Sequence, residues 1–288
     1  MIYENRERRG ASFGAVASEY DEHRPDYPAD AIRWALSPVT DEAPEAGGSG
    51  SGSSGSGGSR AGASRGGAGG LDGLPVLDLG AGTGKLTAQL AALGASVTAV
   101  EPDESMLATL RRQLPGLPAI AGSAESIPLP DSSVRAVLCG QSLHWFDLAR
   151  ALPEIARVLT PGGVLAGLWN NDDDRVEWVA GLHAAAEGAA SPAVSVRIRY
   201  VTEEMDLGGT ASPFAQREIA EFPNSQRRTA TSLVAAIATH SRFLIMEPPE
   251  RDRILARVRR YLGSRPETSA GEFTLPLVTV VLRAVRRS

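Results

Sequence analysis

The chain has 288 residues, a formal net charge of −5 and 42% hydrophobic residues, which is enough apolar material for a sizeable core. Its single cysteine excludes an intramolecular disulfide framework and any metal site built from several cysteines. The mildly acidic balance argues against a general nucleic-acid binder, because neutralising phosphates requires a surplus of basic residues. The chain has no apolar run of membrane-spanning length and no signal-peptide core. We therefore expect a soluble cytoplasmic protein with no nucleic-acid or membrane partner.

The composition divides the chain into four segments. The tract 47–70 contains 12 glycines and 7 serines, so it cannot bury enough apolar surface to offset its backbone entropy. We expect a disordered insertion over residues 41–70, preceded by an N-terminal arm over 1–40. A core over 71–171 follows, and residues 172–288 complete the same domain. A long surface insertion costs little loop-closure entropy, so arm and core can share one fold.

Strand-like and helix-like runs alternate after the tract. This alternation with short links predicts βαβ units and a parallel sheet covered on both faces. In the last run, Pro276 cannot donate to a ladder and favours an edge or bulge position. The predicted strands are 75–79, 96–100, 134–140, 163–169, one near 217–222, and 273–285; the predicted helices are 85–93, 105–114, 148–159 and 175–188.

The sharpest motif is a glycine loop, Gly80-Ala81-Gly82-Thr83-Gly84, between a buried strand and a helix start. Glycines permit positive φ and let a ligand lie against bare backbone, and such loops sit at the carboxyl ends of parallel strands. The next strand ends in Glu101, whose carboxylate suits the two hydroxyls of a ribose.

Three ligand-binding patterns compete for this loop, and the glycines follow the third, G-x-G-x-G with Asp78 two residues ahead. A Walker A motif fails because Leu79 and Leu86 occupy its first and last positions, and a dinucleotide fingerprint fails because Lys85 replaces its third glycine. A tight turn that binds nothing is the remaining alternative to a ligand site.

Four segments within residues 75–171 resemble, in the right order, the motifs of the class I S-adenosylmethionine-dependent methyltransferases. They are VLDLGAGTGKLTAQL, AVEPDESML, AESIPLPDSSVRAVLCGQSLHWF and ARVLTPGGVLAGLWN. The arm sequence FGAVASEYDEHRPDYPAD and the HWF sequence are similar to the branch that includes trans-aconitate methyltransferase. The resemblance implies a Rossmann-like α/β fold with a seven-stranded, mostly parallel sheet, helices on both faces and an antiparallel last strand. It also implies methyl transfer from S-adenosylmethionine to a small-molecule acceptor.

By this resemblance, the core binds S-adenosylmethionine, the arm covers it, and residues 172–288 supply substrate-covering helices. The glycines would line the methionine and ribose, Asp78 would orient the loop or meet the amino group, and Glu101 would take the ribose hydroxyls. An arginine fork suits the methionine carboxylate. The implied cofactor contacts are Tyr20, Arg24, Asp78, Gly80, Ala81, Gly82, Thr83, Gly84, Glu101, Pro102, Asp103, Met106, Ser123, Ala124, Glu125, Gly140, Gln141 and Ser142.

Around the methyl group the protein needs mainly to align an in-line attack and exclude water. We place Phe13, His144, Trp145 and Trp169 at the acceptor. Trp145 would either face the sulfonium through its ring quadrupole or pack against a helix start with Phe146. His144 would be either a general base or a hydrogen-bonded packing residue, since many methyl transfers need no base.

The remaining signals are weaker. Asp172-Asp173-Asp174 is interpreted as a helix cap and not as a metal site, because no second ligand cluster accompanies it. The arginines between 251 and 260 are interpreted as a solvated helix face, and Cys139 as a small buried filler. Two rival functions stay open. One is a non-catalytic cofactor-binding regulator, and the other is an NAD-dependent oxidoreductase.

Overall fold

The computed structural model describes residues 24–40, 71–187, 205, 207, 212–238, 243 and 246–288. The glycine-serine tract and the predicted contacts Phe13 and Tyr20 lie outside the described residues. Within the described part of the chain, no helix is both long and apolar enough to cross a membrane.

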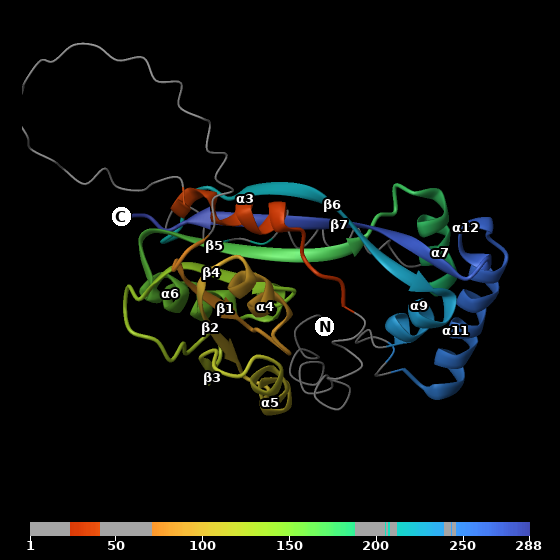
Figure 1. The fold of residues 1–288 in the computed structure, drawn as a ribbon, viewed down its shortest axis with the longest axis horizontal. Helices are drawn as coiled ribbons and strands as arrows, with labels where there is room; N and C mark the ends of the chain where they lie inside the picture. The colour runs from red at the N-terminus through yellow and green to blue at the C-terminus, as the bar shows by residue number, and fades with distance from the viewer. Residues whose placement is uncertain are drawn as a thin grey trace, which may run out of the picture.

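Seven strands form one sheet in the order β3-β2-β1-β4-β5-β7-β6 (Figure 1). The strands are β1 (Pro75–Leu79), β2 (Ser96–Glu101), β3 (Ala119–Ala121), β4 (Val134–Gly140), β5 (Leu159–Asp172), β6 (Glu218–Thr229) and β7 (Glu272–Val285). Strands β1 to β5 pair in parallel, whereas β7 runs antiparallel to both β5 and β6. The predicted α/β class with an antiparallel last strand is confirmed.

Two strands are longer than their apolar runs predict. β5 continues beyond Trp169 because Asn170, Asn171 and Asp172 keep their pairing with β7. β6 continues through Pro223 to Thr229, and as the outermost strand of the sheet it tolerates a proline that cannot donate. The polar or proline-containing ends of both strands carry no alternating apolar pattern, so the sequence predicts both strands to end several residues too early.

An edge or bulge position was expected at Pro276; β7 as a whole lies inside the sheet, between β5 and β6. Pro276 nevertheless lies at a position in β7 where its missing N–H removes no hydrogen bond from the ladder with β5. Along β7, the pairing with β5 begins at Leu277, opposite Asp172 and one residue after Pro276. The carbonyl of Pro276 accepts from the backbone N–H of Asp173 at 3.0 Å, so the side of the proline that lacks an N–H faces the region outside the β5 ladder, while Pro276 still pairs with Ser225 of β6.

Helices cover both faces of the sheet (Figure 1). On one face, α3 and α4 pack in an apolar cluster with β1, β4 and β5; on the other, α6 packs in a cluster that holds Cys139 fully buried. The helices are α3 (Ala29–Thr40), α4 (Lys85–Ala92), α5 (Glu104–Gln113), α6 (Leu148–Val158), α7 (Glu177–Glu187), α9 (Ala230–Ala238), α11 (Pro248–Gly263) and α12 (Pro266–Ser269), with one 3-10 turn, η2 (Leu143–Trp145).

A third apolar cluster joins α7, α9 and α11 to the start of β7. Together with α12 these helices form a cap, which stands at the far end of the long β5, β6 and β7 strands, away from β1 to β3 (Figure 1). The cap is assembled from two connections, because α7 follows β5 whereas α9, α11 and α12 lie between β6 and β7.

Candidate active site

The glycine loop follows β1 and takes a backbone shape that only glycines adopt easily. Gly80, Gly82 and Gly84 have φ values of 69°, 59° and 95°. A Cβ on Gly80 would lie 2.6 Å from the Cβ of Ser142, so a larger residue is also excluded by contact. The backbone N–H groups of Gly80 and Ala81 donate to the carbonyl of Val100 at 2.8 and 3.1 Å, which ties the loop to the end of β2.

Glu101 ends β2 and holds two backbone groups with its carboxylate. Its Oε2 accepts from the N–H of Gly82 at 2.8 Å, and its Oε1 accepts from the N–H of Asp103 at 2.9 Å. Burial raises the pKa of Glu101 above its ordinary value, and the two backbone hydrogen bonds oppose that shift. Each carboxylate oxygen has a further acceptor site, so the oriented carboxylate can also receive hydroxyl donors.

Asp78 lies beneath the loop and is fully buried. Its Oδ2 accepts from the hydroxyl of Thr87 at 2.6 Å, while no donor in the described part of the chain reaches its Oδ1. Burial raises the pKa of Asp78 to about 7. A buried acceptor without a partner is costly, so a ligand that donates to it here would be stabilised.

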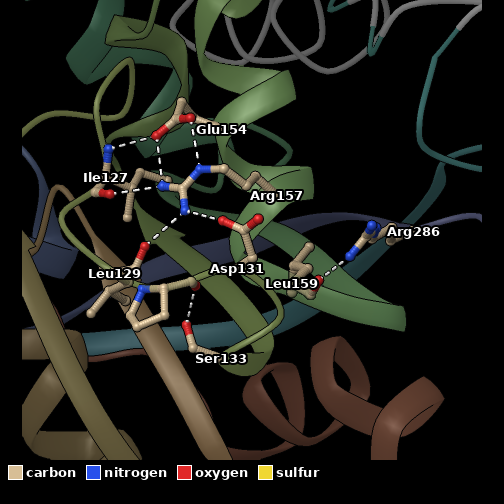
Figure 2. A network of polar contacts seen from close by, with 9 residues as sticks. Ile127, Leu129, Asp131, Ser133, Glu154, Arg157, Leu159 and Arg286 are labelled. Atoms are coloured by element: carbon tan, nitrogen blue, oxygen red, sulfur yellow. Dashed lines mark hydrogen bonds and ion pairs between the residues drawn. The ribbon is translucent and has the colours of Figure 1, made fainter.

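Arg157 on α6 fixes the loop that connects β3 to β4 (Figure 2). Its guanidinium donates to the carbonyls of Ile127 and Leu129 at 2.9 and 2.8 Å and to the carboxylate of Asp131 at 2.8 Å. Glu154 accepts two further bonds from it at 2.9 Å, and this pairing lowers the pKa of Glu154. The loop held in this way begins with the predicted adenine contacts.

Residues 24–27, called the strap below, cross above the loop and are held by their backbone. Lys85 Nζ donates to the carbonyl of Arg24 at 2.8 Å, and Gln89 bonds both the N–H and the carbonyl of Tyr27 at 2.9 and 2.7 Å. Asn170 Nδ2 donates to the carbonyls of Pro25 and Asp26 at 3.1 and 3.2 Å. Because these hydrogen bonds involve only main-chain atoms of the strap, no sequence motif could have predicted them.

Gln141 leaves β4 with a φ of 58°, a backbone conformation that is uncommon for residues other than glycine. Its backbone N–H donates to the carbonyl of Leu168, and its Nε2 donates to the carbonyl of Asn170, both at 2.9 Å. Strained residues held by surrounding bonds are common at functional sites, and this one lies between the ends of β4 and β5.

These elements enclose a cavity of about 450 Å³ at the carboxyl ends of β1 to β5. Apart from Tyr20, which is outside the described residues, every predicted cofactor contact except Gly84 lines it, and so does Trp145. The cavity is lined by Arg24, Pro25, Tyr27, Asp78, Gly80, Ala81, Gly82, Thr83, Lys85, Leu86, Glu101, Pro102, Asp103, Met106, Gly122, Ser123, Ala124, Glu125, Gly140, Gln141, Ser142, Trp145, Phe146 and Asn170.

His144 and Trp169 were predicted at the acceptor, and neither is among the residues that line the cavity. The indole Nε1 of Trp169 donates to Nδ1 of His144 at 3.1 Å. In a neutral imidazole this bond places the ring proton on Nε2, so His144 offers a donor and not a lone pair. The general-base role of His144 stays a prediction.

Sequence reasoning missed several lining residues. Tyr27 belongs to the strap, and Lys85 and Asn170 bind the strap backbone from segments more than 60 residues away. Gly122 precedes the predicted contact Ser123, and Leu86 lies in the first motif two residues after Gly84, so only their positions near predicted contacts could have indicated them.

Comparisons with known proteins agree with this geometry. A methyltransferase domain profile matches residues 77–167. An uncharacterised methyltransferase of Mycobacterium tuberculosis is 38% identical over 276 residues, which cover 95% of each chain. Another, from Schizosaccharomyces pombe, is 36% identical over 171 residues, 59% of this chain and 57% of that one. With its fold, the chain therefore belongs to the class I S-adenosylmethionine-dependent methyltransferases.

A solved structure of similar fold is described as a type II methyltransferase from Anaeromyxobacter dehalogenans. It superimposes with a TM-score of 0.60 over 91% of this chain and 97% of that chain, at 23% identity. At this identity the likeness supports the fold and nothing finer.

Proposed function

We propose that this protein transfers the methyl group of S-adenosylmethionine to a small-molecule acceptor. The observation that carries the proposal is the pairing of a bare glycine loop with Glu101 across the ends of β1 and β2. A ligand can lie against Gly82, because a Cβ built there would have only the sulfur of Met106 within 4 Å, at 3.9 Å.

The residues around the cavity fit this cofactor. Glu101 presents an oriented carboxylate to a ribose diol, and Oδ1 of Asp78 is a buried acceptor that suits the ammonium of the methionine part. The loop after β3, held by Arg157, would bind the adenine edge with Ser123 and Ala124. When bound, the sulfonium supplies an electrophilic methyl group, so the protein has only to orient the acceptor and exclude water.

The strap supports water exclusion. Arg24 and Tyr27 line the cavity from above, while Lys85, Gln89 and Asn170 hold the strap backbone in place. Trp145 adds an aromatic wall that tolerates the cationic sulfonium. Closure over the reacting groups is the usual way in which enzymes keep water out.

Calorimetry tests the proposal against its two rivals. S-adenosylhomocysteine, the product form of the cofactor, should bind with micromolar or better affinity, and NAD should not bind measurably. A metabolite screen should then release S-adenosylhomocysteine with at least one small molecule. Tight binding of NAD would favour an oxidoreductase, and cofactor binding without turnover across the screen would favour a regulator.

A further inference from the structure

Beyond Asn170, the next side chain on the same face of β5 is that of Asp172. Asn170 lines the cavity, and side chains two residues apart on a strand share a face and lie about 7 Å apart. Asp172, the last residue of β5, therefore lies on the same face as Asn170. The end of β5 points toward the cap (Figure 1).

The polar groups before Asp172 are already engaged. Asn170 gives its Nδ2 to the strap, and its Oδ1 accepts from Thr279 at 2.5 Å and from Asn224 at 3.1 Å. The side-chain nitrogen and oxygen of Asn170 therefore both have hydrogen-bond partners already. Asp172 is not among the residues that line the cavity, so an acceptor that contacts it would extend from the cavity past Asn170 toward the end of β5.

Asp172 is fixed through one oxygen only. Nε2 of His183, on α7, lies 2.9 Å from Oδ2 of Asp172, and the side chains of His183 and Asp172 are 8% and 26% exposed. Among the described residues, this contact with Oδ2 is the hydrogen bond given for the Asp172 side chain, and Oδ1 takes no part in it. The neighbouring Asp173 differs, because Arg175 binds both of its oxygens. The buried imidazole therefore holds the part-exposed carboxylate in one orientation through Oδ2 and leaves Oδ1 for another donor.

We propose that Asp172, positioned by His183, is the carboxylate that binds the methyl acceptor, and that this acceptor presents an O–H or N–H group. The inference rests on the proposed methyl transfer. A carboxylate acceptor would be repelled by Asp172, whereas a hydroxyl or amino group would donate to its Oδ1.

This assignment identifies the group that accepts the proton lost by the nucleophile. The acceptor oxygen or nitrogen forms a bond to the methyl carbon, and the carbon–sulfur bond breaks with its electron pair on sulfur. The proton that the nucleophile loses passes to the carboxylate of Asp172. His183 touches neither reacting atom and acts by holding Oδ2, so it is a positioning residue.

The test uses the full chain and a panel of matched probes: benzylamine, benzyl alcohol, phenol and benzoate, with their aliphatic counterparts. The variants are Asp172→Asn, His183→Ala and His183→Gln, with Asp174→Asn as the control that removes a neighbouring charge. Affinity for S-adenosylhomocysteine should stay within two-fold of wild type in all of them. The wild type should methylate amine or hydroxyl probes, and Asp172→Asn should lose at least 100-fold in kcat/KM while Asp174→Asn stays within two-fold.

Two further readouts separate positioning from folding. Binding of the best amine or hydroxyl probe to the protein loaded with S-adenosylhomocysteine should weaken at least five-fold in Asp172→Asn. His183→Ala should lose about ten-fold in kcat/KM, and His183→Gln should recover most of it, because its amide N–H replaces the Nε2 donor. The assignment is overturned by methylation of carboxylates alone, by no methylation of any amine or hydroxyl probe, or by an Asp172→Asn variant within three-fold of wild type. Failure of the wild type to bind S-adenosylhomocysteine would refute the proposed function, and this inference with it.

Discussion

The carboxylate of Glu101 holds the backbone N–H of Gly82 at 2.8 Å, so the acidic end of β2 shapes the glycine loop that follows β1. The same carboxylate also accepts from Asp103, at the start of α5. One side chain thereby sets the relative position of two loops at the edge of the parallel sheet. The group proposed to bind the ribose is fixed before any ligand arrives, which reduces the entropy lost on binding.

Gly80→Ala should destabilise the protein more than Gly73→Ala. The two glycines have nearly equal φ values, 69° and 72°, so both substitutions carry the same backbone strain of about 1 kcal/mol. Only Gly80 also meets a neighbour, because its new Cβ would lie 2.6 Å from Ser142. Chemical denaturation should show an extra loss of about 1–3 kcal/mol for Gly80→Ala. Equal losses would mean that the loop is free to move away from Ser142.

Arg157→Lys should weaken cofactor binding although it keeps the charge. Lysine cannot reproduce the planar fork that bonds the carbonyls of Ile127 and Leu129 together with Glu154. We expect a loss of about 2 kcal/mol in unfolding free energy, since several hydrogen bonds of about 1 kcal/mol each are removed. A drop in affinity for S-adenosylhomocysteine should accompany it. Arg259→Lys, on the exposed face of α11, is the control and should change neither quantity.

Asp78 should make stability decline with rising pH. Burial raises its pKa from 3.8 to about 7, so the folded protein retains a proton that the unfolded chain releases. The stability contributed by this group is therefore fully present below about pH 4 and is lost as the pH rises through 7. Unfolding free energies of wild type and Asp78→Asn, measured from pH 4 to 8, should diverge in that window. Parallel curves would show that Asp78 is already ionised in the folded state.

The sequence predicts the parts of the fold that repeat a simple pattern. The apolar runs ending at Leu79 and Gly140 give β1 and β4 with the observed bounds, and the run at 96–100 misses only the last residue of β2. The three-residue strand β3 was missed, because its pairing with β2 alone, and no pattern of its own, makes it a strand. For the cap, only the presence of helices could be predicted. Its packing joins α7, which follows β5, to α9 and α11, which lie between β6 and β7, so it depends on contacts between distant segments.

The same difference between local sequence patterns and contacts between distant segments applies to the site. Gly82 and Glu101 lie in two successive motifs, at the ends of neighbouring strands, so their meeting could be predicted. Asn170 could not be placed, because its role depends on the strap, which lies more than 140 residues earlier in the chain. His183 gives no signal in the sequence, since only the folding of α7 against the end of β5 brings it to Asp172.

The most direct test of the account is the affinity of Glu101→Gln for S-adenosylhomocysteine, measured by calorimetry on protein whose thermal unfolding shows that it is folded. Glutamine keeps the size of the side chain but offers one acceptor oxygen where the carboxylate offers two. We predict that the affinity falls by about 10- to 100-fold, in line with the loss of charge-assisted hydrogen bonds to a ribose diol. An affinity within two-fold of the wild type would contradict the account.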